Sequence, residues 1–120
     1  MRDLENPVVK KSFSFSVRIV NCYKHLLNNN RNMKSLYNQL LSSGTSIGAN
    51  IAESQAAASR IDFRNKLRIS LKEAYETEYW LKLFFEAKIL DKKEFESLLR
   101  DCLELIKLLT SIIKNVKTVK

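Results

Sequence analysis

Apolar side chains recur at helical spacing along most of the chain, and four such stretches can be distinguished. The first runs from about residue 10 to residue 28, and its main apolar stripe consists of residues four, three and four apart: Phe15, Ile19, Cys22 and Leu26. A second stripe beside it consists of Phe13, Val17, Val20 and Leu27. The run NNNRN at residues 28–32 ends the pattern, because asparagines favour turns.

Two further helices follow this turn. The second is predicted over residues 33–58, and the segment SRID separates it from the third, since Ser59 or Asp62 can cap a helix N-terminus. The third is predicted to end near residue 87, and its inward positions are Phe63, Leu67, Ala74, Leu81 and Phe85. A turn at KILDKKE then leads to the fourth helix, with Asp91 as its N-cap.

The fourth helix has the clearest periodicity. Its main stripe has no polar interruption and consists of Phe95, Leu98, Cys102, Leu105, Leu109, Ile112 and Val116. A flanking stripe consists of Leu99, Leu103, Ile106 and Ile113. Because a helix at the rim of a monomeric bundle needs only one stripe, the doubled stripe predicts contact with another subunit. A broad contact within the core is the alternative.

The length of 120 residues fits a single domain, residues 1–120. Two glycines and one proline leave few turn formers for a many-stranded sheet. Four helices of about twenty residues with short connections predict an all-α fold, an antiparallel up-down-up-down four-helix bundle. Residues 1–9, which include Pro7, are expected to form a flexible lead-in.

The segment SGTSIGANIAES at residues 43–54 is rich in small residues and has two interpretations. A phosphate-binding loop requires G-x-x-x-x-G-K-[ST], but here three residues separate the glycines and no lysine follows the second. On a helix, four positions spaced four apart form a ridge with almost no side chain: Gly44, Gly48, Ala52 and Ala56. Such a ridge lets a neighbouring backbone approach closely, so we interpret the segment as a packing surface.

Two polar positions on the same helix, Asn50 and Glu53, lie among small and apolar neighbours. A buried polar side chain is costly unless it is hydrogen-bonded, so we expect a network from them to the third helix. That helix offers Glu73, Glu76, Glu78, Tyr75, Tyr79 and Trp80. A carboxylate metal site is the alternative, but ferritin-like bundles use Glu-x-x-His on two helices, and the only histidine, His25, lies elsewhere. No metal or other cofactor is expected.

The chain is basic, with 21 Lys and Arg against 13 Asp and Glu and a net charge of +8. The charge forms no basic tail and is spread over the helices. It allows attraction to a polyanion such as RNA or DNA, and a well-solvated surface explains it almost as well. The candidate nucleic-acid contacts are Lys10, Lys11, Arg18, Arg60, Arg64, Arg68 and Lys72.

Catalytic and membrane functions have little support in the sequence. One histidine does not allow a confident Ser-His-Asp set, and Cys22 lies on the core stripe without a group that would orient His25. Cys22 and Cys102 form no C-x-x-C pair. The opening segment lacks the apolar core of a signal peptide, and no window of about 18 apolar residues could span a membrane. We therefore expect a cytoplasmic protein that is not an enzyme.

Residues 39–84 have the sequence QLLSSGTSIGANIAESQAAASRIDFRNKLRISLKEAYETEYWLKLF. This segment resembles the bacterial four-helix bundle proteins first noticed as reading frames in intervening sequences of 23S ribosomal RNA genes. With the preceding SFSFSVRIVNCYKHL and the leucine-rich last helix, the resemblance covers about residues 12–115. Ser70 stands where an alanine is usual. Ser43 stands where an arginine is common, which removes one positive charge.

The resemblance implies an antiparallel four-helix bundle that assembles into a ring, typically a homopentamer. The chain is also similar to the accessory variability determinant of diversity-generating retroelements, a basic pentameric barrel that binds nucleic acid and its reverse transcriptase. We therefore expect a non-enzymatic oligomer that binds RNA or DNA through a distributed basic surface. The alternative is an adaptor or scaffold that docks a partner such as a polymerase without contacting nucleic acid.

Overall fold

The computed structural model describes residues 6–117, and all regular structure in this range is helical. It consists of α1 (Pro7–Asn29), η1 (Arg31–Met33, a 3₁₀ helix), α2 (Lys34–Ser54), α3 (Arg60–Glu86) and α4 (Lys92–Asn115). Among the described residues, no helix is both long and apolar enough to cross a membrane. The predicted all-α class with four α-helices is therefore confirmed for this part of the chain.

The first helix begins earlier than predicted. Pro7 occupies its first turn, where the missing N–H of proline costs no hydrogen bond. Asn6 caps the helix, since its Oδ1 accepts a 2.9 Å hydrogen bond from the Val8 N–H. Residues 7–9, expected in a flexible lead-in, therefore form a helical turn, and Val8 is buried. The rest of that expected lead-in, residues 1–5, lies outside the described residues.

The second helix ends earlier than predicted, at Ser54 rather than near residue 58. After it, the N–H groups of residues 55–57 bond to carbonyls three residues back instead of four, which tightens the chain into a turn. Ser59 then caps α3, because its Oγ accepts a 3.0 Å hydrogen bond from the Asp62 N–H. Asp91 caps α4 in the same way through the Glu94 N–H, as predicted.

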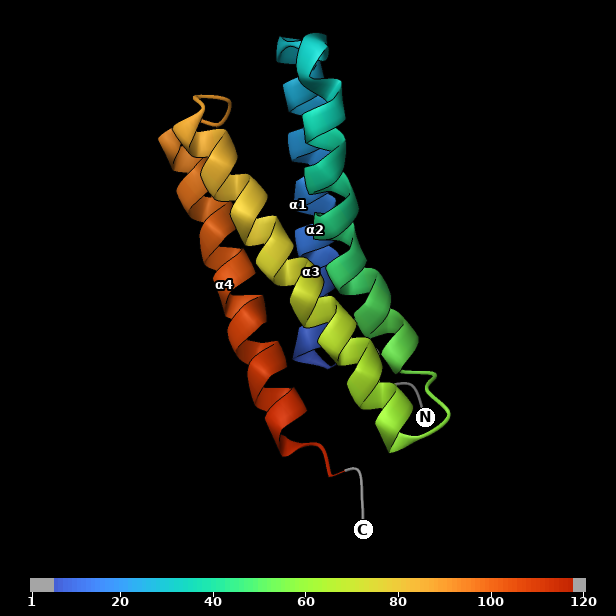
Figure 1. The fold of residues 1–120 in the computed structure, drawn as a ribbon. Coiled ribbons are helices and arrows are strands. Elements are labelled where there is room, and N and C mark those ends of the chain that lie inside the picture. Colours follow the sequence, from blue (N-terminus) through green and yellow to red (C-terminus); the bar gives the residue numbers. More distant parts are fainter. Residues whose placement is uncertain (1–5, 118–120) are drawn as a thin grey trace.

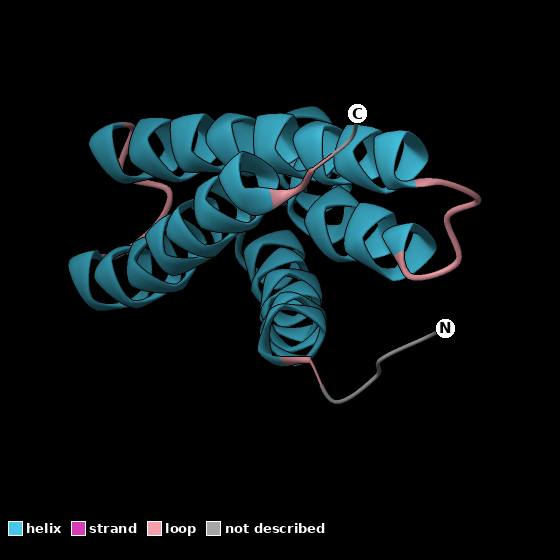
Figure 2. Cartoon of the chain, turned by 90° about the horizontal axis from the view of Figure 1, so that it is seen from below, coloured by secondary structure: helices cyan, strands magenta, loops and turns pink. Residues whose placement is uncertain are grey.

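The helices form an elongated bundle of 51 × 23 × 20 Å, and the chain turns back at each connection (Figure 1). Helix α2 packs against both α1 and α3, and α4 packs closely against α3 and more loosely against α1. Within the described residues no Cα atom of α1 lies within 8 Å of a Cα atom of α3. The two helices lie on opposite sides of the bundle with α2 and α4 between them (Figure 2).

The core contains the predicted main stripe of α1 and most of that of α4, with some exchange between neighbouring positions, while Val116 lies beyond the end of α4. On α3, Phe84 is buried in place of the predicted Phe85, which instead stacks on Phe95 with 4.4 Å between ring centroids. On α4, Ile113 of the flanking stripe is buried in the core, while Leu103 is 43% exposed. The other two flanking residues, Leu99 and Ile106, are half-buried, so the bundle itself covers much of the doubled stripe.

The glycines of the small-residue segment lie where α2 meets α1. A Cβ placed on Gly44 would be 2.8 Å from Cγ1 of Ile19, which is fully buried. A Cβ on Gly48 would be 3.1 Å from the backbone oxygen of Ser12. The segment is helical throughout rather than a loop, and its glycines allow α1 and α2 to pack closely. The ridge does not continue, because Ala52 is exposed and Ala56 lies beyond the helix.

The expected polar network between α2 and α3 has different members. Asn50 donates to the Ser46 carbonyl of its own helix at 2.9 Å, and Glu53 reaches α3 only at the surface, where it pairs with Lys66. The buried links between helices are short hydroxyl groups instead. Ser70 donates to the Ile47 carbonyl at 2.8 Å. The Oγ1 of Thr77 lies 3.0 Å from the Oγ of Ser43, and both residues are buried.

Small hydroxyls suit this position because helices in close contact leave no room for an amide or a carboxylate. The two residues in which the chain departs from the resembled family, Ser43 and Ser70, both belong to this buried set. The remaining predicted partners serve α3 itself: the Trp80 Nε1–H donates to Glu76 Oε2 at 3.1 Å, and the Glu73 carbonyl accepts from Thr77. Burial raises the pKa of the Glu73 carboxyl, and the nearby Glu76 carboxylate adds to this rise.

Candidate nucleic-acid interface

The fold brings together cations that are far apart in the sequence. Helix α1 and helix α3 both begin at the lower end of the bundle in Figure 1, and α4 ends there. The side chain of Arg60 donates to the Lys117 carbonyl at 3.3 Å, and Lys11 pairs with Glu104 at 3.1 Å. These contacts join the start of α3 to the end of α4, and the start of α1 to the lower half of α4.

We call residues 7–12, 53–72 and 105–117 the basic end of the bundle. It contains ten cations: Lys10, Lys11, Arg60, Arg64, Lys66, Arg68, Lys72, Lys107, Lys114 and Lys117. It contains two carboxylates, Glu53 and Asp62. The other described residues carry nine cations and nine carboxylates. The whole excess of positive charge in the described chain therefore lies at one end.

Few of these cations are neutralised by a carboxylate. Lys66 pairs with Glu53 at 2.8 Å, and Lys11 pairs with Glu104 from outside the basic end. Among residues 6–117 no carboxylate lies within ion-pair distance of six others: Arg64, Arg68, Lys72, Lys107, Lys114 and Lys117. The buried Nε of Arg64 also finds no acceptor there. The basic end therefore keeps most of its charge available to an anion.

Arg18 differs from the other candidate contacts. Its Nη1 lies 2.6 Å from Asp101 Oδ2, and its Nη2 donates to the Ser97 hydroxyl at 2.9 Å. The guanidinium thus links α1 to α4 above the basic end, with its charge balanced by a carboxylate. Arg18 therefore lies outside the basic end, and its charge is balanced within the subunit, as that of Lys11 is. The other six predicted contacts all belong to the basic end.

The charges of α3 run against its macrodipole. A helix N-terminus favours carboxylates and a C-terminus favours cations. Yet Arg60 and Arg64 lie in the first two turns of α3, with Asp62 as the only carboxylate, and the last turn has no cation and ends at Glu86. This distribution lowers helix stability, so stability does not explain it. It adds the positive end of the helix dipole to the cations of the basic end.

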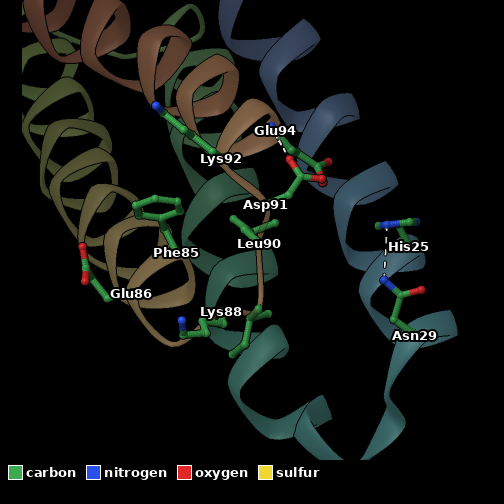
Figure 3. A pocket seen from close by; sticks show the side chains of 10 residues that line it. His25, Asn29, Phe85, Glu86, Lys88, Leu90, Asp91, Lys92 and Glu94 are labelled. Atoms are coloured by element: carbon green, nitrogen blue, oxygen red, sulfur yellow. Dashed lines mark hydrogen bonds between the residues drawn. The ribbon is translucent and has the colours of Figure 1, made fainter.

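A pocket of about 540 Å³ lies at the opposite end of the bundle, between α1 and the α3–α4 connection (Figure 3). Its walls carry both signs of charge, with Lys88 and Lys92 near Asp91 and Glu94. His25 faces it from α1, where its Nε2 lies 3.3 Å from the Asn29 amide nitrogen. The mixed charges do not single out a class of ligand.

Both cysteines are free and buried in the core. Burial raises the pKa of Cys22 and that of Cys102 to about 12, so both are protonated thiols near neutral pH. Cys102 donates to the Ala74 carbonyl at 3.3 Å. Among the described residues no three His, Cys, Asp or Glu side chains come together as metal ligands would.

Sequence patterns missed two features of this surface. The convergence of cations depends on which helix ends meet, which a count along the chain does not reveal. Large apolar side chains also remain exposed outside the core, and Phe13 on α1 and Tyr79 on α3 are 70% and 59% exposed. The exposure of Phe13 could have been predicted from its stripe, since that stripe extends past the half of α1 that faces the core.

Comparison with known proteins agrees with the fold. The family model for the 23S rRNA-intervening sequence protein matches residues 4–111. A solved structure of a protein with unknown function from the S23 ribosomal protein family of Bacteroides thetaiotaomicron VPI-5482 is 52% identical, with a TM-score of 0.85. The similarity covers 90% of this chain and 99% of that one. No curated protein matches the chain. The chain therefore belongs to the 23S rRNA-intervening sequence protein family.

Proposed function

We propose that this protein is a non-enzymatic, homo-oligomeric helical bundle that binds RNA or DNA phosphates at its basic end. The observation that carries the proposal is the location of the charge: ten cations and two carboxylates lie at one end, and the rest of the described chain is balanced. A merely solvated surface would need no such separation. Polyanion binding benefits from it, because closely spaced cations raise the local potential.

The assembly we propose is an antiparallel bundle repeated in a ring, as the resemblance to pentameric family members implies. A ring would present several copies of the basic end to one strand. Weak contacts to phosphates then add up, because binding at one subunit raises the effective concentration of nucleic acid at the next. The resemblance to the accessory variability determinant of diversity-generating retroelements supports the same arrangement.

Salt dependence tests this proposal directly. We would titrate labelled RNA and labelled DNA of mixed sequence with the full chain between about 50 and 200 mM salt, a range over which phosphate contacts weaken strongly. We expect the logarithm of the association constant to fall linearly with the logarithm of salt, by roughly 0.7 per phosphate contact for single strands. No binding at low salt, or an affinity that ignores salt, would contradict the proposal.

The alternative is an adaptor that docks a protein such as a polymerase without touching nucleic acid. The exposed apolar side chain of Phe13 favours some protein contact at α1. An adaptor would bind its partner equally well before and after nuclease treatment, and it would show no salt-dependent affinity for the labelled strands. The salt titration therefore separates the two candidates.

A further inference from the structure

One side of α3 carries cations of the basic end followed by exposed aromatic rings. Arg64, Arg68 and Lys72 follow one another at intervals of four residues, and Tyr75 and Tyr79 continue the line at intervals of three and four. Residues three or four apart are neighbours on a helix surface, so these five side chains form one line, which we call the α3 stripe. At the usual helical rise the stripe is roughly 22 Å long. It starts near the lower end of the bundle in Figure 1.

The two tyrosines of the α3 stripe are not used by the fold. The other two tyrosines of the chain are, since Tyr37 is buried in the core and the hydroxyl of Tyr23 donates a 2.7 Å hydrogen bond to helix α2. Tyr75 and Tyr79 are instead 52% and 59% exposed. Within residues 6–117 neither of their hydroxyls has a hydrogen-bond partner. Their rings therefore remain available to a ligand.

Tyr79 also rests on a rigid support. The ring of Trp80 packs edge-on against it with 5.0 Å between centroids. The indole N–H of Trp80 donates to Glu76 Oε2 at 3.1 Å, and the indole ring packs against the buried Phe84. A ring that is already held in place loses little conformational freedom when a flat group stacks on it, so the support favours binding.

We propose that a single strand of RNA or DNA lies along the α3 stripe, with its phosphates on the cations and unpaired bases stacked on Tyr75 and Tyr79. This inference rests on the nucleic-acid binding proposed above and adds the class of strand and its path. Proteins hold single strands without sequence preference by combining a row of cations with aromatic rings. A duplex keeps its bases paired and stacked on one another, so it would contact the cations but not the rings.

Three carboxylates on the same half of α3 leave the stripe free. Glu78 forms an ion pair with Lys82 at 2.7 Å, and Glu76 accepts the indole N–H described above. Glu73 directly follows Lys72, and adjacent residues of a helix do not face the same side. The cations of the stripe therefore keep their charge for phosphates, as their lack of a carboxylate partner among residues 6–117 indicates.

The stripe ends at the tyrosines. Glu86 lies seven residues beyond Tyr79, which is two turns further along the same side, and the last turn of α3 has no cation. A carboxylate there repels phosphate, so the strand should reach from the basic end to Tyr79 and no further. Cations followed by rings thus suit a strand whose backbone is held at the basic end while its free bases reach the tyrosines.

Replacing the rings tests the proposal. We would titrate the full chain with labelled oligo(dT), labelled oligo(U) and a labelled mixed-sequence DNA duplex of the same length, at one fixed salt concentration. Tyr75→Ala and Tyr79→Ala should each weaken binding of the single strands at least about fivefold, because each removes a stacking surface. Duplex affinity should change less than about twofold. A difference between the oligo(dT) and oligo(U) arms shows which of the two strands the stripe prefers.

Two sets of variants serve as controls. Tyr75→Phe and Tyr79→Phe keep the rings and should keep the single-strand affinity. Phe13→Ala removes a still more exposed ring that lies on α1, away from the stripe, and should leave the single-strand affinity unchanged. Circular dichroism checks that each variant is folded, and light scattering checks that its mass in solution equals that of the wild type.

Several results would overturn the inference. These are an equal loss of single-strand and duplex binding in the alanine variants, a loss as large in Phe13→Ala, or a changed mass, which would place the tyrosines between subunits. If the alanine variants bind single strands as the wild type does, and binding still weakens with salt, the stripe is not the path but the proposed function stands. An absence of salt-dependent binding to every probe would remove both.

Discussion

Gly48 of α2 lies directly against Ser12 of α1, with its Cα so close that an added Cβ would be 3.1 Å from the serine carbonyl oxygen. One turn earlier, Gly44 lies against Ile19 in the same way. These contacts fix the height of α1 against α2, and buried hydroxyls fix α2 against α3. The position of the basic end depends on this packing.

Gly44→Ala is expected to lower the free energy of unfolding. Alanine gains about 1 kcal/mol of helix propensity over glycine. Its Cβ would be 2.8 and 2.9 Å from the two γ carbons of Ile19, a β-branched and fully buried side chain that cannot move aside. Overpacking of this kind typically costs about 1–3 kcal/mol, so we expect a net loss in urea unfolding.

Ala49→Gly provides the control, because Ala49 is exposed on the same helix. It should lose about 1 kcal/mol through propensity alone. If Gly44→Ala instead stabilised the protein by the amount that Ala49→Gly destabilises it, the close approach of α1 would not constrain position 44.

The Arg18–Asp101 link should contribute modestly to stability and nothing to nucleic-acid binding. Both side chains are more than a third exposed, so solvent screens the pair, and a double-mutant cycle with Arg18→Gln and Asp101→Asn should give a coupling of about 0.2–1 kcal/mol. The coupling should shrink in high salt. Neither substitution should change RNA affinity more than about twofold, whereas a large loss in Arg18→Gln alone would restore Arg18 as a phosphate contact.

The two buried thiols should make the fold sensitive to alkali. In the folded chain the pKa of Cys22 and that of Cys102 rise from 9.0 to about 12, so the folded state holds these protons more tightly than the unfolded state. Their stabilising effect is complete below pH 9.0 and is lost as the pH rises toward about 12. Denaturation between these values should show the free energy of unfolding falling with pH.

A Cys22→Ala, Cys102→Ala variant should show a smaller fall over the same range. Thiol-specific reagents should react slowly with the native chain near neutral pH and rapidly in denaturant. Rapid labelling of the native chain would show that the thiols are accessible.

The helices could be predicted because their signals are local. Periodic apolar residues defined all four helices, and Asp91 was identified as a cap from its type and position. Apolar periodicity alone places the start of α1 too late, because Pro7 belongs to the first turn, for which proline is well suited. Asn50 was assigned to a buried network because its neighbours are small, but its amide turns back to its own helix.

The site could be predicted only in part because it depends on which helix ends meet. Six of the seven proposed phosphate contacts lie at the basic end, but Lys107, Lys114 and Lys117 were not proposed. They are separated from the others by more than thirty residues and join them only after α4 returns to the start of α1. Arg18 was included because a sequence does not show that Asp101, on another helix, lies beside it.

The central claim is that the location of the cations at one end, rather than the total charge of the chain, makes this bundle bind nucleic acid. Two triple variants remove the same charge at opposite ends: Arg64→Glu, Lys107→Glu, Lys114→Glu at the basic end, and Lys88→Glu, Lys92→Glu, Lys93→Glu at the other. RNA affinity at a fixed, near-physiological salt concentration should fall at least about tenfold in the first variant and change less than about threefold in the second, with the salt slope reduced only in the first. Equal losses in both variants would contradict the account.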